Sequence, residues 1–159
     1  MSHISRAWTA VLFILLCVSA AEAFDFSRYK AADLDDLLQQ QLPSSGADIF
    51  PQIPLKISGT LVAYGETCQT GFLKKTMLMA GIPQQAIDSV AMTRCIRVRS
   101  AKGREVRLYI QDVVADALPN EVALGDTVTL FVLRLFAEAR GPGLLVNEFS
   151  VGNGKATRK

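Results

Sequence analysis

The segment from Arg94 to Asp112 (RCIRVRSAKGREVRLYIQD) restricts the fold more than any other part of the chain. Two runs of alternating residues flank a short turn that ends at Gly103, and this pattern is typical of a β-hairpin. Successive side chains of a strand point to opposite faces, so one alternate set is expected to be buried. That set is apolar and consists of Ile96, Val98, Val106, Leu108 and Ile110. The segment therefore predicts strands over Arg94–Arg99 and Arg104–Gln111 in a chain built around a sheet.

The opposite face of this hairpin is basic and carries an aromatic ring. It presents Arg97, Arg99, Arg107 and Tyr109, and residues 74–107 contain eight Lys or Arg against two Asp or Glu. In small barrels an exposed face of this kind often binds single-stranded nucleic acid, but an anionic glycan, a lipid head group or an acidic protein surface would better suit an exported chain. An antiparallel sheet also normally has one polar, solvated face. We therefore keep both interpretations, a binding face and a merely solvated one.

Other segments predict three more strands and three short helices. The strands are expected over residues 55–64, 127–136 and 144–151, and the helices over residues 70–80, 84–92 and 112–118. Five strands with a short helix between the third and the fourth resemble an OB-fold, a small Greek-key barrel. A helical insertion between the first two strands departs from the plain pattern. The expected class is therefore mainly β, a five-stranded OB-like small barrel; an SH3-like barrel or an open α+β sheet is the alternative.

The chain before this β domain predicts an amphipathic helix followed by a linker. The helix is expected over Ser27–Leu42, with a stripe made of Leu34, Leu37, Leu38 and Leu42. The prolines between Pro43 and Pro54 favour a linker, which would leave the leucine stripe free to contact a partner. The expected organisation is thus residues 24–54 for helix and linker, 55–151 for the β domain, and 152–159 for a disordered basic tail.

The first 23 residues predict a signal peptide that is removed on export. A weakly basic start precedes 15 uncharged residues, Ala7–Ala21, and Ala21-Glu22-Ala23 offers the small residues of a cleavage site. The alternative, a membrane anchor, needs about 20 apolar residues. The mature chain is therefore expected to begin near Phe24 and to be soluble and exported. Its compartment would be the periplasm if the source is bacterial, and otherwise the protein would be secreted.

Two cysteines, Cys68 and Cys95, remain after the expected cleavage. In an oxidising compartment pairing is the natural interpretation, and two buried free thiols are the alternative. The bond would close a loop of about 27 residues, which in the chain-entropy model stabilises a fold by about 3–4 kcal/mol. A metal site is not expected, because two thiolates without histidine leave the usual four positions of zinc underfilled.

The available residues limit the chemistry of the chain. The one histidine, His3, lies in the predicted signal peptide, so no Ser-His-Asp unit and no histidine-ligated metal centre is expected after cleavage. The sequence contains no phosphate-binding glycine loop and no nucleophile elbow. Asp112 and Asp116 share one face of an expected helix, but capping and solvation explain them more simply. We therefore expect no catalysis and no cofactor, and keep a carboxylate-dependent hydrolase as an alternative.

These observations favour a non-catalytic binding or scaffold protein that contacts another envelope or secreted protein. The first alternative is a protein that binds an anionic glycan or lipid head group through Arg97, Arg99 and Arg107. Nucleic acid is not an expected partner, because it is scarce outside the cytoplasm.

Overall fold

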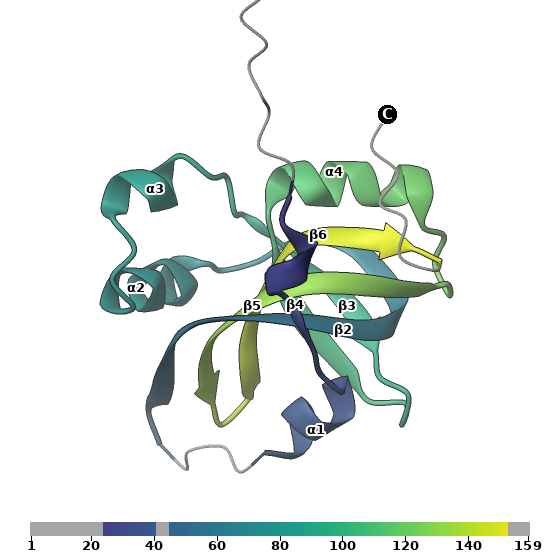
Figure 1. Cartoon of the computed structure of the whole chain (residues 1–159), viewed down its shortest axis with the longest axis horizontal. Helices are drawn as coiled ribbons and strands as arrows, with labels where there is room; N and C mark the ends of the chain where they lie inside the picture. The colour runs from purple at the N-terminus through teal and green to yellow at the C-terminus, as the bar shows by residue number, and fades with distance from the viewer. Residues whose placement is uncertain (1–23, 41–44, 153–159) are drawn as a thin grey trace, which may run out of the picture.

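The strands of the chain form one closed sheet, which Figure 1 shows in a computed structural model that describes residues 24–40 and 45–152. In this part of the chain strands outweigh helices, so the expected mainly β class is confirmed. The predicted signal peptide, Leu42 of the leucine stripe and the predicted tail beyond Gly152 lie outside the described residues.

Within the described ranges, six strands pair in the order β1-β2-β3-β4-β6-β5, and β5 pairs back with β2 to close a ring. The strands are β1 (Lys30–Ala31), β2 (Ala47–Thr67), β3 (Arg94–Arg99), β4 (Glu105–Ile110), β5 (Thr127–Glu138) and β6 (Gly141–Val151). Neighbouring strands are antiparallel, except for β1 with β2 and β4 with β6. A sheet that closes in this way is compatible with a barrel-like fold.

Helices lie at the ends and on the outside of the ring. They are the 3₁₀ turn η1 (Phe26–Arg28) and the α-helices α1 (Leu34–Gln39), α2 (Gly71–Met79), α3 (Gln84–Asp88) and α4 (Asp112–Glu121). In Figure 1, α4 lies above the sheet and α1 below it, and both contribute apolar side chains to the main core. Helices α2 and α3 pack on a second cluster that includes Leu73, Ile87 and Phe136. Over the described ranges, no helix has both the length and the apolar character needed to cross a membrane.

The hairpin expected around Gly103 is present, formed by β3 and β4. Its register pairs Arg97 with Arg107 and Val98 with Val106. Four of the five residues expected inside have no exposed surface: Ile96, Val98, Leu108 and Ile110. The fifth, Val106, is half-buried beside the core. The alternation of apolar residues therefore predicted this pair of strands and its orientation correctly.

The long N-terminal helix predicted over Ser27–Leu42 is wrong. The described part of this segment folds as η1, the short strand β1 and the six-residue helix α1. The helix begins only at Leu34, because the Asp33 carboxylate accepts hydrogen bonds from the backbone N–H groups of Asp35 and Asp36 and so caps it at this point. Upstream, β1 pairs with β2, and the N–H of Ala32 donates to the carbonyl of Lys56 at 2.9 Å.

The linker predicted up to Pro54 is also wrong from Ala47 onward, because β2 begins there and not at Leu55. Ala47 already pairs with Glu138 of β5, and the pairing continues to Thr60. The register shifts between Ile49 and Ile53, which accommodates Pro51, whereas Pro54 pairs with Leu133 in the regular part of the ladder. At the end of β5 that pairs with Ala47, the connection expected between the strands over 127–136 and 144–151 reduces to the two residues 139 and 140, because β6 begins at Gly141.

The disulfide between Cys68 and Cys95 is present, with the two Cα atoms 5.8 Å apart. It lies at the base of the insertion that holds α2 and α3. There the N–H of Cys68 also donates to the carbonyl of Thr93 at 3.0 Å. The bond therefore fixes the start of the insertion to β3, so α2 is held against the ring rather than hanging from a free loop.

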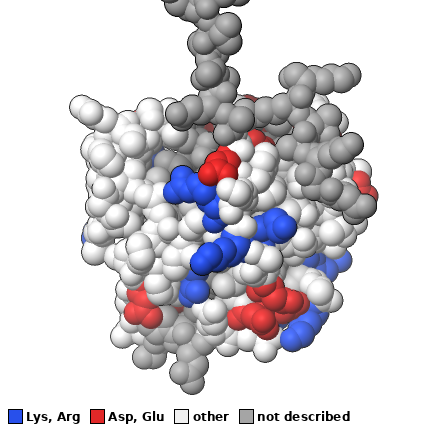
Figure 2. All heavy atoms as spheres, viewed as in Figure 1, with Lys and Arg blue, Asp and Glu red and all other residues white. Residues whose placement is uncertain are grey.

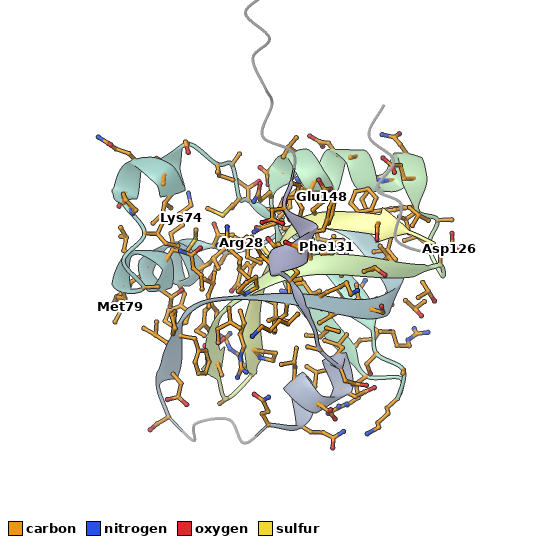
Figure 3. All side chains as sticks on the ribbon, viewed as in Figure 1. Arg28, Lys74, Met79, Asp126, Phe131 and Glu148 are labelled. Carbon is orange, nitrogen blue, oxygen red and sulfur yellow. A yellow bond between two sulfur atoms is a disulfide. The ribbon has the colours of Figure 1, made fainter. Side chains whose placement is uncertain are left out.

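The N-terminal residues dock on the outside of the ring through aromatic side chains. The rings of Phe24, Phe26 and Tyr29 lie with their centroids 4.7–5.9 Å from the ring of Phe131. Figure 3 shows Phe131 beside the η1 turn, and only 5% of this residue is exposed. The phenol of Tyr29 also accepts a hydrogen bond from the side chain of Asn147. The start of the described chain is therefore part of the domain.

Candidate functional site

A groove of about 780 Å³ lies beside β4. Strand β4 borders it through Glu105–Arg107 and Tyr109, and the start of β6 borders it through Gly141–Gly143. The start of α2 and the disulfide form another side. Leu38 of α1 also lines it. We call this concavity the β4–β6 groove. Met79 is not part of it, since it lies at the outer end of α2 and is exposed (Figure 3).

Three aromatic rings from three separate elements line the β4–β6 groove. The rings of Phe72 and Phe136 meet edge to face with centroids 4.9 Å apart, and the ring of Tyr109 lies 6.2 Å from that of Phe136. Phe136 is buried, whereas Phe72 is 40% exposed. Edge-to-face contacts fix the mutual orientation of such rings. The three rings, which we call the aromatic floor, therefore offer a preformed apolar surface.

The local sequence explains why these three rings converge. Tyr109 points outward because its neighbours Leu108 and Ile110 point into the core. Phe72 lies in the first turn of α2. Its neighbour Leu73 is fully buried in the second cluster and so anchors this turn beside the ring. Phe136 pairs with Gly143 across β5 and β6, and its ring fills the space that a side chain at position 143 would occupy.

Charged side chains surround the aromatic floor. Glu138 and Arg140 form an ion pair at 3.1 Å at the β5–β6 turn. Burial raises the pKa of the Tyr109 phenol, and the Glu138 carboxylate raises it further, against the opposing charges of Arg140 and Arg107. Tyr109 is therefore held as a neutral phenol, which can donate a hydrogen bond to a ligand in the groove.

The predicted arginine face is divided by acidic neighbours. Arg97 lies 3.2 Å from Glu66 and 3.6 Å from Glu105, and Arg99 lies 2.7 Å from Glu105. The hydrogen bond from Arg99 lowers the pKa of the Glu105 carboxyl. Arg97 lies directly opposite Arg107 in the ladder, and like charges in such a pair repel. The carboxylates of Glu66 and Glu105 offset this repulsion.

Arg107 differs from the other two arginines of the predicted face. Among the described residues it forms no ion pair, and it lines the β4–β6 groove together with Tyr109. The side of the molecule seen in Figure 2 likewise carries basic and acidic side chains close together. Of the three arginines predicted to form a binding face, Arg97 and Arg99 are thus neutralised by carboxylates, and Arg107 is the cation at the groove.

The leucine stripe predicted to contact a partner faces the chain's own core. Leu34 and Leu37 are 3% and 5% exposed and belong to the main cluster inside the ring. Leu38 is half-buried and lines the groove. Because α1 packs on the ring of its own chain, Leu34 and Leu37 are not available to a second protein in this conformation.

The two carboxylates predicted to share a helix face do converge, but on an arginine. Asp112 accepts hydrogen bonds from the backbone and hydroxyl of Thr93, and both Asp112 and Asp116 contact the Arg94 guanidinium. Burial alone would raise the pKa of Asp112, yet the hydrogen bonds from Thr93 and the charge of Arg94 lower it. This arrangement ties α4 to β3. Over the described ranges, no group of three or more His, Cys, Asp or Glu could hold a metal ion.

The residues of the β4–β6 groove that sequence reasoning missed include Phe72, Phe136, Glu138 and Arg140. Phe72 lies in a segment whose helical pattern says nothing about which strand it meets. Residues 138 and 140 fall where the glycines around Pro142 predict an irregular loop, although residue 138 still belongs to β5 and residue 140 lies in the two-residue turn before β6. A phenylalanine paired with a glycine across neighbouring strands is a recognisable signal, but it requires the register first.

Comparison with protein-family models, with curated proteins and with solved structures found no match for this chain.

Proposed function

We propose that this chain is an exported, non-catalytic binding protein that holds an extended segment of another envelope or secreted protein in the β4–β6 groove. The observation that carries the proposal is the aromatic floor: three rings from β4, α2 and β5 lining one groove of about 780 Å³. A concavity of this volume that combines aromatic side chains with polar groups at fixed positions is typical of a binding site.

The topology supports the same position for a ligand. We assign the ring to an OB-like small barrel, with β2 as its first strand, the α2–α3 insertion between its first two strands, and α4 between its third and fourth. Barrels of this type bind ligands on the face of their second and third strands and with the loops after the first and fourth strands. In this chain those elements are β3, β4, the insertion and the β5–β6 turn, and all four contribute residues to the groove.

Binding of peptides in the groove can be measured directly. Peptides selected from a random display library on the immobilised protein are labelled and titrated with the wild type and two variants. Phe72→Ala removes an exposed ring of the aromatic floor, whereas Leu124→Ala removes an apolar side chain that is at least as exposed and does not line the groove. We expect Phe72→Ala to weaken binding about tenfold, since aromatic anchors dominate interface energies, and Leu124→Ala to leave it unchanged. Equal effects of the two variants, or a selection without binders, would contradict the proposal.

A second candidate function rests on Arg107, the arginine of the predicted face that has no ion pair among the described residues. Its charge beside Tyr109 suits an anionic glycan or a lipid head group. On a heparin column, Arg107→Ser should then elute at clearly lower salt than the wild type. Arg99→Ser should elute close to the wild type, because Glu105 already neutralises that residue. Elution of the wild type without retention would remove this candidate.

A further inference from the structure

Strands β4 and β6 close the ring through only two residue pairs, and their remaining lengths diverge at the β4–β6 groove. We propose that the peptide bound in this groove adds to the free edge of β4 as a further strand. This inference rests on the proposed function and specifies the chemistry of its ligand: an extended peptide with an acidic side chain for Arg107 and an apolar side chain for the aromatic floor.

The strand pairing defines where the edge is free. Only Tyr109 and Ile110 of β4 pair with β6, opposite Leu145 and Val146. The preceding residues of β4, 105–108, pair with β3 alone, and residues 141–144 of β6 pair with β5 alone. Both stretches border the groove, so it lies between two strand edges that have separated. A peptide in an extended conformation can bind to such an edge through main-chain hydrogen bonds.

The direction of the backbone groups follows from the hairpin. In an antiparallel ladder, alternate residue pairs exchange hydrogen bonds, and the pairs between them point these groups outward. Next to the turn, the N–H of Ser100 donates to the carbonyl of Arg104 at 2.8 Å. The N–H and C=O groups of Glu105 and Arg107 therefore point away from β3. Just beyond β4, the N–H of Gln111 donates to the carbonyl of Val146, which places the same alternate set toward β6.

The edge of β4 suits an added strand better than the edge of β6. Pro142 pairs with Ala137 inside β6 and has no N–H to donate. A proline is tolerated in a strand when its nitrogen points away from the neighbouring strand, which here means toward the groove. The β6 edge therefore lacks a donor at this position. On β4, both Glu105 and Arg107 offer an N–H and a C=O.

The side chains around the edge select the peptide. Glu105 is engaged by Arg97 and Arg99, which leaves Arg107 as the cation beside the edge. An acidic side chain on the added strand would neutralise it, and the rings of Phe72 and Tyr109 would accept an apolar side chain. A second copy of this chain fits less well, because antiparallel pairing of two β4 edges would bring two Arg107 residues onto one patch.

The experiment tests main-chain hydrogen bonding directly. Each peptide selected by display is resynthesised with a single N-methyl group at successive positions and titrated against the full-length mature protein. We expect loss of binding by about tenfold or more at alternate positions, where an N–H would face β4, and little change at the positions between them. Equal tolerance of N-methyl groups at every position would overturn strand addition. If peptides that tolerate every N-methyl group still bind more weakly to Phe72→Ala, the proposed binding function stands, but strand addition does not.

Two variants test the same edge from the protein's side. Arg107→Ser removes the charge but keeps the N–H, whereas Arg107→Pro also removes the N–H that points into the groove and leaves the ladder with β3 intact. We expect Arg107→Pro to bind these peptides about tenfold more weakly than Arg107→Ser, with the fold of both confirmed by thermal melting. Equal affinity of the two variants would overturn the proposal. Sedimentation of the wild type and both variants measures the oligomeric state. If the wild type and Arg107→Ser form a dimer and Arg107→Pro does not, a second copy of the chain occupies this edge. That result would overturn the peptide assignment.

Discussion

Phe136 and Gly143 form the pair on which the aromatic floor depends. They lie opposite each other on β5 and β6, and a Cβ atom at position 143 would overlap three carbons of the Phe136 ring. The phenylalanine therefore packs across the glycine of the neighbouring strand, and Phe72 packs on it from outside. Because the ring has no room to retreat into the packed second cluster, any side chain at 143 must move it.

We predict that Gly143→Ala lowers the free energy of unfolding by about 1–3 kcal/mol, the usual cost of overpacking a well-packed site. Gly71→Ala is the matched control, because a Cβ at this groove-lining position meets no atom within 4 Å and Gly71 lies in a helix. It should be neutral or stabilising by up to about 1 kcal/mol. Urea unfolding of both variants measures the difference. A neutral Gly143→Ala would mean that Phe136 does not occupy the position described.

Single residues were predictable from the sequence where one pattern determined them. The alternation around Gly103 identified the buried face of the hairpin, and export chemistry indicated the bond between Cys68 and Cys95. The groove residues were not predictable in this way. Their shared position depends on the register of β5 with β6 and on the packing of α2, and neither of these leaves a period in the sequence.

Helix α1 has six residues and is held by the core and by one buried carboxylate. Asp35 is 2% exposed, and it accepts hydrogen bonds from the Ser100 hydroxyl at 2.7 Å and the backbone of Lys102 at 2.9 Å. The Arg104 guanidinium donates to the same carboxylate at 2.8 Å. This group of residues connects α1 to the turn of the β3–β4 hairpin. So short a helix has little stability of its own, and these contacts keep it in place.

Removal of the apolar contacts of α1 should therefore affect the whole domain. We predict that Leu34→Ala lowers the free energy of unfolding by about 2–4 kcal/mol, since it leaves a cavity in the main core. The half-buried Leu38, four residues later, is the comparison, and Leu38→Ala should cost less than half of that amount. Urea unfolding compares the two variants. If both are neutral, α1 is a detachable segment, and the predicted leucine stripe regains its role in binding a partner.

The Asp35 carboxylate should make stability depend on pH. Burial alone would raise its pKa, but the hydrogen bonds from Ser100, Arg104 and Lys102 outweigh burial and lower it. A carboxyl group whose pKa is lowered in the folded state stabilises the fold above its unfolded pKa of about 3.9, and this contribution is lost as the pH falls through the folded value. Asp35→Asn should therefore be less stable than the wild type at pH 7, and the gap should narrow below about pH 4.

Urea unfolding at pH 7, 5 and 3 measures this gap. Asp36→Asn serves as the control, because Asp36 is adjacent and exposed. A gap for Asp35→Asn that stays constant from pH 7 to pH 3 would contradict the assigned role of the carboxylate.

The N-terminal elements show why the helix and linker predictions failed. Leucines at helical spacing and prolines 51 and 54 gave strong local signals, but pairing with distant strands outweighed them. Lys30 pairs with Leu55, and Ile53 pairs with Arg134, so the folding partners of these residues lie 25 to 81 positions away. Local propensity is a weak guide when tertiary pairing decides the structure.

The molecule as a whole combines a ring of long-range pairings with an insertion held by one covalent bond. We predict that replacing Cys68 and Cys95 together by serine lowers the free energy of unfolding by about 3–4 kcal/mol, as expected for a loop of this length. Hydrogen exchange should then rise mainly in α2 and α3, while β5 and β6 stay protected. Reductant should destabilise the wild type and leave the double variant unchanged. Equal stability of the two oxidised proteins would show that packing alone holds the insertion.

The closure of the ring also fixes an order of events during synthesis. Ala47 pairs with Glu138, which lies 91 residues later in the chain (138 minus 47). A chain that leaves a ribosome or crosses a membrane from its N-terminus therefore delivers β2 long before the strand that covers one of its edges. Pairings between such distant segments form slowly, on the order of milliseconds to seconds. In that interval the apolar side of β2 and the hairpin of β3 and β4 remain uncovered, and this nascent half-ring is the species that a holding chaperone would recognise.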